Sequence, residues 1–235
     1  MMRKIFTLFL LSLFFAVSGC IEIRDEFFLN PNSSGKVVHK AVFQPIDFNL
    51  NEQAQSDPEK EMLRAVRDEL TKSEGVETWK DVSYERTDDD RILFKGTAYF
   101  KNLADLKLHN SGTHFSILIP QLQKEGPGTL MLKLEDKSSE KKADQTDTKK
   151  PLSEAEIEKQ IKAQRSAYNR AKPMMLGMLS TFVIEQKYHL PGKLIRHANL
   201  KPDANGILHI NLTGEKILST IDELMKDDAW VRKQV

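Results

Sequence analysis

The sequence predicts an α+β protein in which a mainly antiparallel sheet has helices packed on one side. Three observations carry this prediction. Several short runs alternate apolar and polar residues, as strands with one buried face do. Two pairs of these runs are joined by turn-forming residues, as in β-hairpins. Longer segments repeat apolar residues at helical spacing instead.

The first expected hairpin covers residues 21–44. In its first strand, residues 21–29, every second position faces one side, and that face carries Ile21, Ile23, Phe27 and Leu29. Residues 30–35 are Asn, Pro, Ser and Gly, which form turns. Residues 36–44 then return as the second strand. A strand that begins at Ile21 leaves almost no linker after Cys20.

The next elements follow in order to residue 135. Ser56, Asp57 and Pro58 start a helix that ends at Glu74-Gly75. Residues 82–87 and 91–100 flank three aspartates and form a second hairpin. A short helix is expected over 102–108, and strands over 115–119 and 129–135, on either side of a Gly-Pro-Gly turn.

Residues 136–150 contain no large apolar side chain, and we expect a disordered charged segment there. A long helix opens at Ser153, and Pro173 should break or kink it. Strands over 181–189 and 207–212 and an amphipathic helix over 214–226 complete the chain. We expect one domain over 20–235, whose single sheet pairs 129–135 with 181–189. Two small domains divided near residue 140 are the alternative.

The first twenty residues contain the three parts of an export signal in their usual order: a basic start, an apolar run and a cleavage site. Arg3 and Lys4 precede an apolar run over 5–18 that is shorter than the roughly 20 residues of a spanning helix. Small residues then precede Cys20, as they do before a cleavage site. The segment Val17-Ser18-Gly19-Cys20 resembles the lipobox of bacterial lipoproteins.

That resemblance implies removal of residues 1–19 and lipidation of Cys20, with acyl chains such as palmitate holding the protein in a membrane. Ile21 follows the cysteine where lipoproteins retained in the inner membrane often carry Asp. The resemblance therefore implies an outer-membrane lipoprotein that faces the periplasm. An ordinary secreted protein with a chance cysteine is the alternative.

Composition excludes several classes of function. Cleavage before Cys20 would leave one basic residue fewer than acidic residues, so there is no basic excess to indicate nucleic-acid binding. Cys20 is the only cysteine, which excludes intrachain disulfides, zinc fingers and thiol catalysis.

No cofactor, metal site or catalytic set is predicted. His109, His114, His189, His197 and His209 lack the spacing of a helical zinc pair. The three aspartates at 88–90 lack the other ligands of a calcium loop. A nucleophile elbow and a phosphate-binding glycine loop do not occur. We therefore expect a protein that is not an enzyme.

Three methionines close together make the most unusual segment of the remaining chain. Met174, Met175 and Met178 could form an adaptable apolar face for a ligand or a partner. Packing of the same residues into the core is the alternative.

Cys20 with an immediate strand, Asn30–Gly35, Leu190–Lys193 and the helix that starts at Gly214 are similar to uncharacterised LppM-like envelope lipoproteins. This resemblance implies a compact α+β domain at the cell-envelope surface with affinity for lipid or glycolipid, and no catalytic residues.

The expected function is that of a membrane-anchored envelope lipoprotein with a non-catalytic binding or scaffolding domain. Its partners would be the membrane, through the acyl chains on Cys20, and an envelope protein or lipid. One alternative is a protein that binds lipid or apolar ligands through residues 174–179. A less favoured alternative is an envelope hydrolase.

Overall fold

A computed structural model describes the protein over residues 21–43, 57–109, 119–135, 153–198 and 200–233. These residues form two compact units. The sheet unit contains the described residues up to 135 together with 183–211, and the helical unit contains 153–182 and 212–233. Helices and mainly antiparallel strands confirm the predicted α+β class. Cys20 and the charged segment 136–150 lie outside the described residues.

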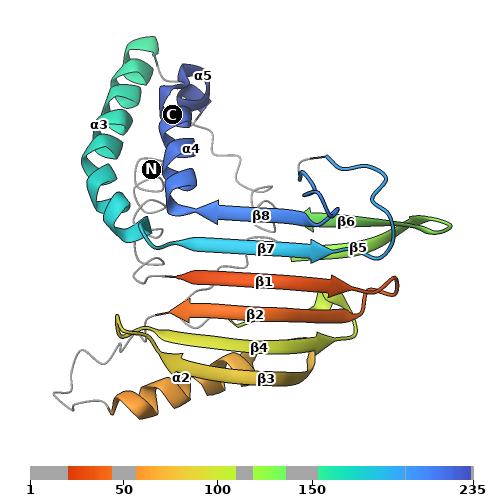
Figure 1. Cartoon of the computed structure of the whole chain (residues 1–235). Coiled ribbons are helices and arrows are strands. Elements are labelled where there is room, and N and C mark those ends of the chain that lie inside the picture. The colour runs from red at the N-terminus through yellow and green to blue at the C-terminus, as the bar shows by residue number, and fades with distance from the viewer. Residues whose placement is uncertain (1–20, 44–56, 110–118, 136–152, 199, 234–235) are drawn as a thin grey trace. The chain divides into compact units, whose positions relative to one another are not determined.

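Six strands form the main sheet in the order β3-β4-β2-β1-β7-β8 (Figure 1). They are β1 (Glu22–Leu29), β2 (Gly35–Phe43), β3 (Val76–Arg86), β4 (Ile92–Phe100), β7 (Val183–His189) and β8 (Leu208–Thr213). Both predicted hairpins are present, as β1–β2 and β3–β4. β7 runs parallel to β1, which makes the sheet mixed.

The predicted pairing of residues 129–135 with 181–189 is wrong. β6 (Thr129–Glu135) pairs with β5 (Ile119–Gly126) in a separate two-stranded sheet. Its leucines, Leu132 and Leu134, pack against the core of the sheet unit. β7 instead lies beside β1, where the backbone N–H of Val183 donates to the carbonyl of Ile21 at 2.9 Å. Two halves of the chain still contribute to one sheet, although through β1 rather than β6.

One face of the sheet carries two apolar clusters, and the first of them includes a residue of helix α2 (Pro58–Lys72). This helix begins at Asp57, whose side chain accepts from the backbone N–H of Glu59. Its Val66 packs in a cluster with Ala41, Phe43, Ile92 and Phe94. The second cluster brings together residues from β1, β2, β4, β7 and β8, including Phe27, Val37, Phe100, Tyr188 and Leu208.

The short helix predicted over 102–108 is a single 3-10 turn, η1 (Leu103–Asp105). Leu103 and Leu106 are buried in the second cluster, as their spacing predicts. The helix ends early because Leu106 is extended and Lys107 forms a bridge with Glu74.

The helical unit contains α3 (Glu154–Leu179), α4 (Gly214–Lys226) and α5 (Asp228–Lys233). A capping box between Ser153 and Glu156 starts α3. Of the predicted break or kink at Pro173, the break is wrong, because α3 continues through the proline to Leu179. Four residues along one stripe of α3 are buried: Ile161, Tyr168, Met175 and Leu179.

Contacts on both sides of Pro173 explain why α3 stays continuous. Before the proline, the Tyr168 hydroxyl donates to Asp222 of α4 at 2.8 Å, and Lys172 pairs with the same carboxylate at 2.7 Å. After it, Met175 and Leu179 are buried. A proline inside a helix costs about 3 kcal/mol. Burial on both sides of the proline, together with the Lys172–Asp222 ion pair before it, offsets this cost.

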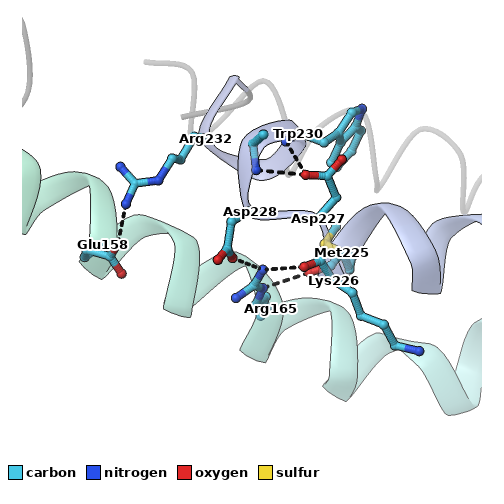
Figure 2. Close-up of polar contacts among 9 residues, drawn as sticks. Glu158, Arg165, Met225, Lys226, Asp227, Asp228, Trp230 and Arg232 are labelled. Carbon is cyan, nitrogen blue, oxygen red and sulfur yellow. Dashed lines mark hydrogen bonds and ion pairs between the residues drawn. The ribbon is translucent and has the colours of Figure 1, made fainter.

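Arg165 of α3 binds the junction of α4 and α5, as Figure 2 shows. Its Nε donates to the carbonyl of Met225 at 2.8 Å, and one Nη donates to Asp228 at 2.6 Å. The last carbonyls of a helix lack partners within the helix, so the guanidinium satisfies one of them. The Asp227 side chain then accepts from the backbone N–H of Trp230 and starts α5. In the described part of the chain, no helix is both long and apolar enough to span a bilayer.

Candidate functional site

Three ionisable side chains meet in the core of the sheet unit, and we call Asp25, His39 and Glu69 the polar centre. They come from β1, β2 and α2. Only 7% of Asp25 is exposed, and His39 and Glu69 are fully buried. Charged groups are rarely buried unless they are paired, so this cluster is the strongest candidate for a site in the sheet unit.

Strand register places the first two members. Asp25 and His39 lie directly opposite each other in the β1–β2 pair. Both occupy core-facing positions, because the burial pattern of each strand alternates through them. The Oδ1 of Asp25 lies 2.6 Å from the Nδ1 of His39, within hydrogen-bonding distance.

Helix α2 supplies the third member from above the same sheet face. Glu69 lies one helical turn after Val66, which packs in the α2 cluster. Its Oε2 is 4.0 Å from the Nε2 of His39. That distance is too long for a hydrogen bond, so the interaction of these two groups is electrostatic. His39 thus has a carboxylate on each of its two nitrogens.

Aromatic rings enclose the imidazole. The ring centroid of His39 lies 5.8 Å from that of Phe94 and 6.3 Å from that of Trp79. Gly96, the residue opposite His39 on β4, makes room for the indole. A Cβ added there would lie 3.0 Å from the Trp79 ring. The missing side chain therefore lets Trp79 lie against the polar centre.

The environment of His39 favours its charged form. Burial alone would lower the pKa of the imidazole, but the charge and hydrogen bond of Asp25 and the charge of Glu69 outweigh it and raise the pKa. Burial and the nearby Asp25 charge also raise the pKa of Tyr188, on β7. Tyr188 therefore stays neutral, and His39 is the cation of the polar centre.

An aspartate that orients a histidine is one part of many acid–base sites. The second nitrogen would have to reach a nucleophile or a substrate. In this structure the Nε2 of His39 has no hydrogen-bond partner among the described residues, and the imidazole is closed to solvent. The arrangement can therefore connect α2 to the sheet by charge, but it offers no access to a substrate.

The polar centre predicts how stability depends on pH. The folded pKa of His39 is raised above the roughly 6.5 of an unfolded histidine. Its contribution is therefore complete below pH 6.5 and is lost as pH rises through the folded pKa. We expect urea denaturation to show falling stability above that pH, and a flatter profile in His39→Gln. Identical slopes in the two proteins would contradict the assignment.

The methionine segment lies on α3 but does not form one face. Met175 is 3% exposed and belongs to the buried stripe, whereas Met174 is 57% exposed. Met178 is half-buried, and Leu176 is 49% exposed. The exposed apolar surface is thus Met174 with Leu176. Cys20, the predicted lipidation site, lies outside the described residues.

Of the histidines named in the sequence analysis, His114 lies outside the described residues, and three of the others bind separate partners. His189 pairs with Glu26 at 2.7 Å, and His209 pairs with Glu185 at 3.0 Å. The backbone N–H of His109 donates to Ser73. Among the described residues, no three His, Cys, Asp or Glu side chains are placed to hold a metal ion.

Sequence reasoning did not identify Asp25 and His39. The sequence pattern could have revealed them, since Asp25 is a charged residue that lies between Ile23 and Phe27 on the apolar face of its strand. Likewise, His39 lies at the core-facing position between Val37 and Ala41. Glu69 gave a weaker signal, because an acid in a helix is usually exposed.

Comparison with known proteins gives no family for this chain. The sequence matches no protein-family model. It also has no significant match among curated proteins or among solved structures.

Proposed function

We propose that the protein is a lipid-anchored lipoprotein of the cell envelope, and that its folded part binds a partner or a lipid rather than catalysing a reaction. One observation carries the proposal. β1 begins at Glu22, and the carbonyl of Ile21 already accepts the N–H of Val183 at 2.9 Å. The sheet therefore begins directly after Cys20, the residue expected to carry the acyl chains.

Such a junction determines how far the protein can move from the membrane. A flexible linker adds reach that grows with the square root of its length, and here none separates Cys20 from β1. One acyl chain gives only reversible membrane binding, whereas two give stable anchoring. A multiply acylated Cys20 would hold the sheet unit permanently at the bilayer surface.

Two observations bear on what the folded part does. The only histidine–carboxylate cluster buried among the described residues is closed to solvent, which favours binding over hydrolysis. The exposed Met174 and Leu176 support a second candidate, the binding of an apolar ligand or partner. Hydrolytic activity that disappeared in a folded His39→Gln variant would contradict a non-catalytic role.

Anchoring is tested by replacing the cysteine. In cells grown with a clickable fatty acid, Cys20→Ser should abolish acyl labelling and leave residues 1–19 uncleaved, which intact-protein mass measures. The matched control is Cys20→Ser with Ser219→Cys, which returns a thiol to an exposed position on α4. Labelling that persisted in Cys20→Ser, or returned in the control, would overturn the proposal.

A further inference from the structure

The face of the sheet opposite the polar centre carries several cations whose side chains are at least partly exposed among the described residues. Besides Lys187 of β7, alternation along the strands places five cations on this face: Arg24 of β1, Lys36 and Lys40 of β2, Lys80 of β3 and Lys95 of β4. We call these five residues the lysine face. Val38 in its centre is 39% exposed, and about half of each side chain is exposed for Arg24 (48%) and Lys95 (49%).

Three of these cations form a row across neighbouring strands. Arg24 is directly opposite Lys40, and Lys40 is directly opposite Lys95. Like charges in directly opposed positions destabilise a sheet. Lys40 has no carboxylate within ion-pair distance among the described residues. Arg24 and Lys95 have carboxylate partners on their own or a neighbouring strand, so Lys40 is the cation of the row whose charge is not balanced within the sheet.

The other two lysines lie over aromatic rings. The ammonium of Lys36 is 5.0 Å from the ring centroid of Phe28, and that of Lys80 is 5.3 Å from that of Tyr99. A cation over a ring keeps its full charge, because the ring carries none. Both ammonium groups therefore remain available to an anion, while the rings give the face apolar area.

Acidic residues on this side of the sheet are concentrated on β1 and β7. Glu26 pairs with His189, and Glu185 pairs with Lys187 and lies near Arg24. Glu22 pairs with Arg24. On the β2, β4 and β3 side, Glu85 lies 3.9 Å from Lys95. The cations thus exceed the acids on the half formed by β2, β4 and β3.

We infer that the lysine face docks on the anionic headgroups of the bilayer that holds the protein. This inference rests on the proposed anchoring, which places β1 directly at the membrane. A broad set of four lysines from three strands and one arginine from a fourth can reach several headgroups at once, and each cation near an anionic surface contributes separately. Tyr99, beside Lys80, has the apolar ring and polar tip of side chains that lie at membrane interfaces.

Lysine footprinting tests this in the intact protein. The full chain is purified from membranes and reconstituted into vesicles of phosphatidylcholine, with or without phosphatidylglycerol, and treated with an amine-acetylating reagent. Acetylation of Lys36, Lys40, Lys80 and Lys95 should slow about fivefold in the anionic vesicles. Lys124 and Lys193, exposed elsewhere in the sheet unit, should not change. High salt should abolish the protection.

Charge variants separate docking from local shielding. In Lys36→Gln/Lys40→Gln, the remaining Lys80 and Lys95 should lose their protection in anionic vesicles. The matched control, Lys124→Gln/Lys193→Gln, should keep it. Far-UV circular dichroism checks that both variants are folded.

Two outcomes would overturn the inference: equal acetylation in neutral and anionic vesicles, or protection that depends on protein concentration. The last would indicate contact between two copies of the chain. Flotation with the vesicles reports anchoring separately. A protein that floats without protection disproves the docking alone, whereas a protein that is not acylated and does not float disproves the proposed function.

Discussion

Replacing His39 by glutamine should lower the free energy of unfolding of the sheet unit by about 3–5 kcal/mol, because it removes the cation between two buried carboxylates. Asp25 loses a charged partner at 2.6 Å, and Glu69 loses one at 4.0 Å. Neither carboxylate can turn to water, since both are buried. Guanidinium unfolding followed by far-UV circular dichroism measures the loss.

His209→Gln is the matched control. His209 also pairs with a glutamate, at 3.0 Å, but it is exposed. Exposed ion pairs contribute about 1 kcal/mol or less, so this variant should remain close to the original protein. A loss as large as that of His39→Gln would show that the difference does not come from burial.

A triple variant tests the reason for the loss. Replacing Asp25, His39 and Glu69 together by leucine removes every buried charge at once. Apolar replacement of a whole buried ion cluster is often neutral or stabilising. We expect the triple variant to be more stable than His39→Gln. A still lower stability would mean that the shape of these side chains, and not their charge, holds α2 on the sheet.

Gly214→Ala should lower the stability of the helical unit by about 3 kcal/mol, at the upper end of overpacking costs. A Cβ at this position would lie 1.9 Å from the carbonyl oxygen of Leu179 and 2.7 Å from its carbon. A backbone atom cannot rotate away as a side chain can. The backbone N–H of Gly214 also donates to the carbonyl of Phe182 at 3.0 Å. This hydrogen bond keeps the start of α4 close to the end of α3.

Gly177→Ala is the control for this change. It lies inside α3, and a Cβ there meets nothing within 4 Å. Alanine in a helix interior is about 0.5–1 kcal/mol better than glycine, so this variant should be slightly more stable. Amide hydrogen exchange of α4 distinguishes the two, with faster exchange in Gly214→Ala alone. Equal exchange in both variants would contradict the predicted clash.

Local patterns predicted most elements, because alternation and turn residues act over a few positions. The β1–β2 hairpin and the helix over 214–226 were found in this way. The predictions that were wrong depend on contacts between residues far apart in the sequence. The spacing along α3 could not show that Asp222 would bind Lys172 beside Pro173. Nor could alternation show that β7 would pair with β1 rather than with β6.

The candidate site was missed for a related reason. An aspartate on the apolar face of an alternating strand looks like a simple break in the apolar pattern. Only the register of β1 with β2 brings Asp25 opposite His39. The lysine face has the same origin, since Arg24, Lys40 and Lys95 are far apart in the sequence and form a row only once three strands are aligned.

The parallel pairing of β1 with β7 has a consequence for the order of folding. Glu22 is the partner of Val183, so one edge of β1 must wait for a strand near the end of the chain. Contacts this distant in sequence slow folding. Until β7 has formed, one edge of β1 has unpaired backbone groups that could pair with another chain. The β1–β2–β4–β3 part of the sheet can assemble earlier, and β7 then closes the remaining edge of β1.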